Sequence, residues 1–233
     1  TMPTAIKKLV EKQFHNPSFV KVKNKSLTAN SVEQYYTLVR YRDQIEALRR
    51  YLDFVEDCYG IVFCRTKMQT EELAAELNHL GHKADALHGD MAQDQRDLAM
   101  DNFKSKKVTL LVCTDVAARG IDVNDLTHVI NFSLPQDNES YVHRIGRTGR
   151  GGKMGLSLSI ITPDEEGRIA QIERRTNAKI HKVKLPTVKE IRRSVIQKAA
   201  NELTEQLDRV EDVPENFITM FKRHFEELSK DDL

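Results

Sequence analysis

The chain has 233 residues, and its 36 Lys and Arg against 35 Asp and Glu give a formal net charge of only +1, so bulk charge does not indicate a nucleic-acid-binding protein. No segment approaches the roughly 20 apolar residues that a membrane-spanning helix needs. The length fits one full domain with a smaller appendage. The composition therefore argues against a membrane-spanning protein and against a strongly basic protein.

The first part of the chain predicts a short helix, a linker, and then alternating strands and helices. A helix is expected over residues 4–14, and the Lys-rich, aperiodic stretch that follows suits a linker. Apolar residues at steps of three and four then predict helices, and short continuous apolar runs predict buried strands. Up to residue 103 we expect strands over 35–39, 61–64 and 84–88, and helices over 43–55, 66–81 and 93–103.

The second part continues the same alternation, with strands expected over 108–113, 128–132 and 156–161. Thr162–Pro163 opens another helix, with proline at its first position. Strands that alternate with helices predict right-handed βαβ units, which gives an α/β fold with a mostly parallel sheet and helices on both faces. Ligands bind such sheets beyond the carboxyl ends of the strands, so we expect the polar residues there to converge on one edge.

The run His143–Arg150 (His-Arg-Ile-Gly-Arg-Thr-Gly-Arg) is the most informative segment. Arginine is always protonated and presents a planar fork of donors that matches phosphate oxygens. Spaced by three residues, Arg147 and Arg150 are expected on one face of a helical turn, where both can reach one phosphate group. A solvated basic loop is the alternative for a charge run taken alone.

Three further segments precede this run in a fixed order. They are Ile61–Lys67 (IVFCRTK), Leu87–Arg96 (LHGDMAQDQR) and Val112–Val123 (VCTDVAARGIDV). With the arginine run they resemble motif IV, the Q-x-x-R element, motif V and motif VI of the DEAD-box RNA helicases. The resemblance covers roughly residues 20–180, and the tail beyond Leu185 resembles the bacterial cold-shock, DeaD-type branch more weakly. It implies a RecA-like lobe in an ATP-dependent RNA helicase.

The resemblance also predicts that this chain is one part of a longer enzyme. The sequence contains no G-x-x-x-x-G-K-[ST] phosphate loop and no Asp-Glu-Ala-Asp run, and Thr1–Pro3 resembles the end of motif III of the first lobe. We expect a remnant of the first helicase lobe in 1–18, an inter-lobe linker in 19–34, the second RecA-like lobe in 35–185 and an all-α extension in 186–233. Such a fragment is expected to be inactive as an ATPase by itself.

For ATP, the resemblance implies that Arg150 is the arginine finger and Arg147 a second contact to the γ-phosphate. Asp122 is expected to accept a hydrogen bond from the ATP ribose beside Gly120, although a turn cap is the alternative for a lone Asp. Mg²⁺ is expected mainly on the first lobe, and this chain shows no metal-ligand pattern. His143 and Arg144 are expected to brace the arginine run.

For RNA, the resemblance implies contacts to the backbone, because a general unwinding enzyme cannot depend on base sequence. The expected positions are Thr66, Arg65, Gly89, Asp90, Arg96, Thr114 and Arg119. Gln93 is expected to orient Arg96. Three of these have alternatives: Thr66 can cap a helix, Thr114 can cap the following turn, and Arg96 can pair with Asp90 or Asp94. Arg119 also resembles an interdomain contact, for which a surface salt bridge is the alternative.

The tail after Pro186 predicts two amphipathic helices that are too small to bury their apolar faces alone. They must pack on the lobe, on each other or on another chain. The family resemblance favours a homodimer. Its expected interface residues are Val188, Ile191, Val195, Leu203, Leu207, Phe217, Phe221 and Phe225.

Two other functions stay open at this point: a superfamily 2 DNA helicase lobe, and a non-catalytic RNA-binding or assembly scaffold. Retained Arg147, Arg150 and Asp122 argue against the scaffold. The expected partners are therefore RNA, the first helicase lobe and a second copy of the chain. The three cysteines have no metal-ligand spacing, which suggests structural thiols in a reducing cytoplasm.

Overall fold

The computed structural model describes residues 4–15, 17–18, 31–119, 121, 123, 125–208 and 219. The expectations for Thr1–Pro3, for most of the linker, for Gly120 and Asp122, and for the second tail helix with Phe217, Phe221 and Phe225 therefore lie outside the described residues. The first described element is helix α1 (Thr4–Gln13).

Seven parallel strands form one sheet in the order β3-β4-β2-β5-β6-β1-β7. Their bounds are β1 Val32–Leu38, β2 Gly60–Phe63, β3 Ala84–Leu87, β4 Leu110–Cys113, β5 His128–Asn131, β6 Gly155–Ile161 and β7 His181–Lys182. The expected parallel α/β sheet is confirmed. The two-residue edge strand β7 was not predicted, because two residues are too few to show a period.

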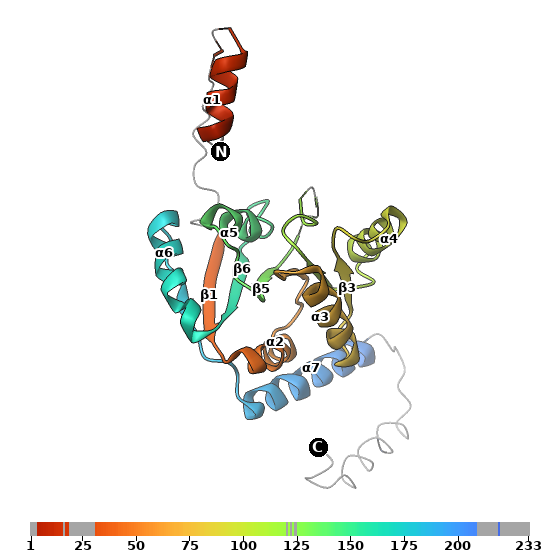
Figure 1. The fold of residues 1–233 in the computed structure, drawn as a ribbon. Helices are drawn as coiled ribbons and strands as arrows, with labels where there is room; N and C mark the ends of the chain where they lie inside the picture. Colours follow the sequence, from red (N-terminus) through yellow and green to blue (C-terminus); the bar gives the residue numbers. More distant parts are fainter. Residues whose placement is uncertain are drawn as a thin grey trace.

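Helices cover both faces of this sheet (Figure 1). On β2, Val62 points to one face, where it joins a core with α2 and α3, while Ile61 and Phe63 point to the other, where they meet α4. A third cluster packs α5 and α6 against β1 and β6. The helices are α2 Gln44–Phe54, α3 Lys67–His79, α4 Gln93–Lys104, α5 Asn138–Ile145 and α6 Glu166–Thr176.

Strand β1 begins three residues earlier than the sequence suggested. Val32 pairs with Gly155 in the ladder to β6 and is buried, so residues 32–34 belong to the sheet and not to the linker. The expected boundary at residue 35 is therefore wrong. The polar residue Gln34 interrupts the pattern of apolar residues expected on the buried face of this strand. Its side chain nevertheless points into the core, where it accepts a hydrogen bond from the Tyr141 hydroxyl at 3.1 Å.

Helix α7 (Val188–Asp208) packs against α2 on its own lobe (Figure 1). The Ser194 hydroxyl donates to the Phe54 carbonyl at 2.9 Å, and Lys198 Nζ donates to the Asp53 and Val55 carbonyls at 3.0 and 2.6 Å. For this helix, the structure thus shows the lobe-packing alternative. Among the described helices, none is both long and apolar enough to cross a membrane.

Candidate functional site

Three loops lie side by side at the carboxyl ends of neighbouring strands. Thr66 follows β2, Gly89 and Asp90 follow β3, and Thr114 follows β4 directly. Because these three strands are adjacent in the sheet, at about 4.8 Å per step, their loops form one continuous edge. We call Thr66, Gly89, Asp90 and Thr114 the carboxyl-edge group.

Thr66 is the N-cap residue of α3, as its alternative interpretation predicted. Its Oγ1 accepts a hydrogen bond from the Gln69 N–H at 3.1 Å, and the Gln69 side chain accepts one from the Arg65 N–H at 2.9 Å. Capping uses the hydroxyl as an acceptor, and a hydroxyl also carries a hydrogen that can donate. The cap therefore orients Thr66 without excluding a phosphate contact.

Two side-chain contacts tie the loop after β3 to helix α3. Lys67 forms an ion pair with Asp90, and His88 Nε2 lies 2.7 Å from Glu71 Oε1. The buried position of His88 places that contact beneath the loop. The loop that carries Gly89 is therefore held by α3 as well as by its own strand.

Arg96 on α4 is held by the same loop. Its Nη1 donates to the His88 carbonyl at 3.1 Å, and this backbone contact replaces the expected pairing with Asp90 or Asp94. Gln93 donates to Asp97 at 2.8 Å, so the expected role of Gln93 in orienting Arg96 is corrected: the His88 carbonyl provides that contact.

Arg144 is the best-anchored cation of the arginine run. It is only 2% exposed, and its Nε and Nη2 donate to the Asp115 carboxylate at 2.5 and 2.8 Å. Its Nη1 donates to Asn131 Oδ1 at 3.0 Å and to the Ser133 carbonyl at 2.6 Å. The guanidinium also lies 4.8 Å from the centre of the Phe63 ring. These contacts fix α5 on the sheet.

The residues that follow α5 turn away from helical geometry. Helix α5 ends at Ile145, and Gly149 has a left-handed φ of +70°. Arg147 and Arg150 therefore do not lie on one face of a helical turn, and that expectation is wrong. Glycine at position 149 ends the helical pattern, because it adopts left-handed backbone angles readily.

The arginine run extends from the carboxyl ends of the strands toward their amino-terminal ends: Arg144 and Arg147 line a hollow with Asp115, whereas Thr148 and Gly149 lie farther down. The Thr148 hydroxyl donates to the Leu126 carbonyl just before β5, and Gly149 packs against Ser31 just before β1. The expectation that all motifs share one edge therefore holds for Arg144 and Arg147 but not for Thr148 and Gly149. Helix α5 crosses the face of the sheet after β5, and hydrophobic periodicity does not give the direction in which a helix runs. The Arg144 contact to Asp115, beside Thr114, spans the two groups.

Carbonyl contacts position both candidate phosphate-binding arginines. Arg147 Nη1 donates to the Ile121 carbonyl at 3.0 Å, and Arg150 Nε donates to the Gly146 carbonyl at 2.9 Å. Arg147 is half-buried and Arg150 exposed. Two planar cationic forks three residues apart suit a polyphosphate in charge and in donor geometry.

Arg119 lies with the arginine run and not with the carboxyl-edge group. It lines a hollow of about 60 Å³ together with His143, Arg144 and Arg147. The hollow thus gathers four basic side chains from two segments. This position fits the interdomain alternative for Arg119 better than the expected RNA contact.

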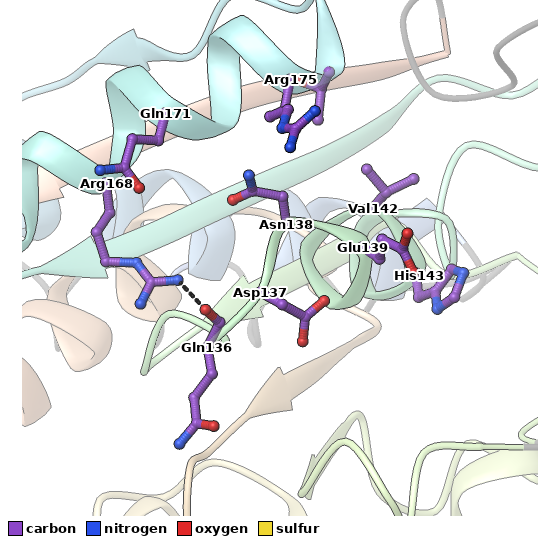
Figure 2. Close-up of a pocket in the computed structure, with 10 residues that line it drawn as sticks. Gln136, Asp137, Asn138, Glu139, Val142, His143, Arg168, Gln171 and Arg175 are labelled. Carbon is purple, nitrogen blue, oxygen red and sulfur yellow. Dashed lines mark hydrogen bonds between the residues drawn. The ribbon is translucent and has the colours of Figure 1, made fainter. Parts of the chain in front are cut away.

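A wider hollow of about 870 Å³ lies between α5 and α6 (Figure 2). Arg168 of α6 reaches across it, and its Nη2 donates to the Pro135 and Gln136 carbonyls at 2.6 and 2.8 Å. The next residue, Asp137, caps α5 by accepting from the Ser140 N–H at 2.7 Å. These contacts fix the start of α5 and thereby the position of His143.

The cysteines do not provide a nucleophile. Burial raises the pKa of the Cys58 and Cys64 thiols to about 12 and raises the pKa of Cys113 further, so all three stay protonated at neutral pH. Among the described residues, no group of three or more His, Cys, Asp or Glu side chains is placed to hold a metal ion.

Sequence reasoning missed the residues that anchor Arg144. Asp115 stands inside a quoted motif, but it is 29 residues from Arg144 and no local pattern pairs them. Asn131 lies at the end of an apolar strand, and Ser133 contributes only its carbonyl. Sequence motifs are defined by side-chain types, so a residue that contributes only a backbone carbonyl cannot be recognised from them.

Comparison with known proteins identifies the family. Residues 43–152 match the model of the helicase conserved C-terminal domain. The DEAD-box ATP-dependent RNA helicase CshA of Bacillus licheniformis is 46% identical over 190 residues, which are 82% of this chain and 39% of that protein. The E. coli DEAD-box protein SrmB, solved bound to regulator of ribonuclease activity A, is 33% identical, with a TM-score of 0.62, over 69% of this chain and 93% of that one.

The chain belongs to the DEAD-box family. It is the C-terminal helicase lobe of that family. A third relative, S. cerevisiae Dbp5 bound to RNA and ADP BeF3, is 25% identical with a TM-score of 0.72 over 84% of this chain and 53% of that chain. This DEAD-box lobe spans about two fifths of the length of the curated relative.

Proposed function

We propose that this DEAD-box lobe works in an ATP-dependent RNA helicase, where it helps to unwind or remodel RNA duplexes at the cost of ATP hydrolysis. The carrying observation is the contact between Arg144 and Asp115, which joins the arginine run to the edge with Thr66, Gly89 and Thr114. One lobe thus couples a polyphosphate-binding segment to a second phosphate-binding edge. The names of the relatives, an RNA helicase and an RNA-bound structure, support the same substrates.

Toward ATP, this lobe would provide arginines, with Mg²⁺ held mainly by the first lobe. Bound ATP supplies a γ-phosphoryl group for transfer to water, a reaction limited by positioning and charge neutralisation. Arg150 and Arg147 would neutralise charge on the γ-phosphate, and the Ile121 and Gly146 carbonyls would orient them. Asp122, beside Gly120, is proposed to accept from the ribose. His143 and Arg144 would brace the run.

Toward RNA, the carboxyl-edge group would bind backbone phosphates without regard to sequence. Thr66 and Thr114 would donate hydroxyl hydrogens, the N–H groups near Gly89 would approach the backbone closely, and Arg65 and Arg96 would supply positive charge. Binding of this kind releases counterions, so RNA affinity should fall steeply as salt rises.

We propose the family's two-lobe arrangement for the rest of the chain. Residues 1–18 would belong to the first lobe and the following stretch, up to β1, would link the lobes. Arg119 would contact the first lobe on closure, because it lies beside Arg147. The chain by itself would then show no ATP turnover.

The test is RNA-stimulated ATP hydrolysis by the two-lobed enzyme and by this chain alone. We expect turnover only with both lobes, and a loss of about a thousandfold or more in Arg150→Ala, as for other arginine fingers. Arg174→Ala is the matched control, because Arg174 Nε also donates to the carbonyl four residues earlier, at 3.1 Å, but lies on α6. Normal turnover in Arg150→Ala would sink the finger assignment, and stimulation by DNA alone would favour the DNA helicase.

A homodimer is a second proposal, carried by exposed apolar residues on α7. Val188, Val195 and Ile196 are 54, 49 and 55% exposed, whereas Ile191 is half-buried. The other interface candidates, Leu203, Leu207, Phe217, Phe221 and Phe225, have side chains outside the described residues. Light scattering over a dilution series should give a dimer for this chain and a monomer for one ending at Leu185.

The matched variants for the dimer are Val195→Asp and Gln197→Asp, which add the same charge to exposed positions of α7. We expect dissociation only for Val195→Asp, since a charge buried in an apolar interface is costly. A monomer before any substitution would contradict the dimer and leave the helicase proposal intact. We also propose a cytoplasmic setting, which the free, protonated thiols of Cys58, Cys64 and Cys113 support.

A further inference from the structure

A crevice of about 410 Å³ opens where the sheet reverses its winding direction. Strands β2 and β5 are neighbours, but the helix after β2 (α3) covers one face and the helix after β5 (α5) covers the other. The loops that leave the two strands therefore diverge. In open α/β sheets, such a switch point is where ligands bind. Of the residues proposed to bind ATP or RNA, only Arg65 and Thr66 line this crevice, and neither accounts for its interior.

Two exposed side chains flank the crevice, one a flat aromatic ring and the other a flexible thioether. Tyr41, in the short turn Tyr41–Asp43 after β1, is 76% exposed, and Met68, in the first turn of α3, is 67% exposed. Ser133 and Thr162, from the loops after β5 and β6, lie between them in the lining. Strands β1 and β2 are three sheet positions apart, about 14 Å, which leaves room for a planar ring between the flanks.

The rim of the crevice is shared with the proposed RNA edge. Arg65 and Thr66 line it, and Arg65 Nη2 lies 3.3 Å from Glu165 Oε1. Glu165 is itself fixed, because its Oε2 accepts from the Thr162 N–H at 3.2 Å. A strand of RNA bound at Thr66 would therefore pass directly over the opening.

The charges in the crevice select against phosphate inside it. One cation, Arg65, faces three carboxylates, Glu72, Asp164 and Glu165, so the lining carries a net charge of 1 − 3 = −2. A phosphate would stay at the rim near Arg65. A neutral heterocycle with amino hydrogens to donate fits the interior, because carboxylates accept hydrogen bonds and aromatic rings stack on bases.

We propose that this switch-point crevice is a nucleobase subsite, in which Tyr41 stacks on one base of the bound single strand while Arg65 and Thr66 hold its phosphate. The inference rests on the proposed RNA function and adds a base contact to it. Stacking tolerates any base, so it is compatible with sequence-independent binding. The carboxylates favour adenine, cytosine and guanine, whose exocyclic amino groups uracil lacks.

Methionine methyl NMR on the whole chain can test the subsite. Met68 reports on the crevice, and Met91, whose sulfur accepts from the His88 N–H at 3.4 Å, reports on the proposed phosphate edge. The probes are octa-adenylate RNA and inorganic polyphosphate of similar length. We expect the RNA to shift both methyl signals and polyphosphate to shift only that of Met91.

Each other pattern has a definite meaning. If RNA shifts Met91 and leaves Met68 in place, the subsite is wrong and the RNA edge stands. If RNA shifts neither methyl signal, the proposed RNA edge fails as well. If polyphosphate shifts Met68 as strongly as RNA does, the crevice is an anion site and not a base site.

Variants provide an independent measurement. Tyr41→Ala should weaken octa-adenylate binding at least about fivefold, as expected when one base loses an aromatic stacking partner. Tyr41→Phe retains the ring and should bind like the parent chain. The exposed position of Tyr41 makes both substitutions compatible with folding. Equal affinity of Tyr41→Ala and the parent chain would overturn the proposal.

Discussion

Arg144 and Asp115 form a two-point ion pair, with the Arg144 Nε and Nη2 atoms 2.5 and 2.8 Å from the two carboxylate oxygens. The arginine is almost completely buried and the aspartate is 40% exposed. Asp115 follows Thr114 at the carboxyl edge, and Arg144 belongs to the arginine run, three residues before Arg147. One buried guanidinium therefore links the arginine run directly to the residue beside Thr114.

Arg144→Lys should destabilise the fold and uncouple the two groups. A lysine ammonium cannot span Asp115, Asn131 and Ser133 together, so buried acceptors lose their donors, at a cost of about 2–4 kcal/mol in the free energy of unfolding. Urea titration measures this. Arg42→Gln is the control, because Arg42 and Asp43 are both exposed and 3.8 Å apart, and a change within about 0.5 kcal/mol is expected there. Equal losses in both variants would contradict the anchoring role.

Gly149→Ala should disturb the arginine run more than Gly151→Ala. Both residues have a left-handed φ, +70° and +63°, so both substitutions carry a backbone cost of about 1 kcal/mol. Only at Gly149 would a new Cβ also meet backbone, 2.6 Å from the Ser31 carbonyl oxygen, whereas Gly151 has open space. We expect a larger drop in unfolding free energy and in ATP turnover for Gly149→Ala. A similar drop for both would show that the contact with Ser31 is easily relieved.

Most of the fold was predictable because the buried strands are continuous apolar runs in the sequence. Ile61, Val62 and Phe63 are all buried, as a continuous apolar run requires of a central parallel strand. The failures occurred where polar residues point inward, as with Gln34, or where an element is too short to show a period, as with β7. A buried polar group such as Gln34 is stabilised by a hydrogen bond to a residue far away in the sequence, here Tyr141. A local sequence pattern does not reveal such a partner.

The sequence predicted which motif residues follow neighbouring strands but not how the arginine run is arranged. The motifs gave Thr66, Gly89 and Thr114 one edge, which the strand order confirms. They did not show that Thr148 and Gly149 lie toward the amino-terminal ends of the strands, because the path of α5 depends on tertiary contacts such as those of Arg144. The family resemblance pointed to Arg147 and Arg150. The carbonyl contacts that hold these two side chains are visible only in the structure.

The stability of the lobe should rise with pH between about 4 and 6.5. Burial lowers the pKa of His128 to about 4, and burial also lowers the pKa of His82. Over that range the unfolded chain binds protons that the folded chain does not, so the unfolding free energy rises by about 1.4 kcal/mol per pH unit for a fully shifted histidine. Urea titration at several pH values should show a smaller slope in His128→Gln. An unchanged slope would assign the effect to other groups.

Lys198→Met should loosen α7 from the lobe. The Lys198 ammonium donates to the Asp53 and Val55 carbonyls at 3.0 and 2.6 Å, at the end of α2 where helix carbonyls lack partners. Methionine retains the apolar stem and removes the donors, so we expect a loss of about 1–3 kcal/mol in the free energy that holds α7 in place. Hydrogen exchange of the α7 amides measures it.

Lys189→Met is the control for α7, because Lys189 is an exposed lysine of the same helix. In this variant the α7 amides should exchange as in the parent chain. Unchanged exchange in Lys198→Met as well would mean that apolar contacts with α2 suffice to dock the helix. If exchange accelerates only in Lys198→Met, one ammonium controls whether α7 is fixed to the lobe. The orientation of any partner bound through Val188 and Val195 would then depend on that single contact.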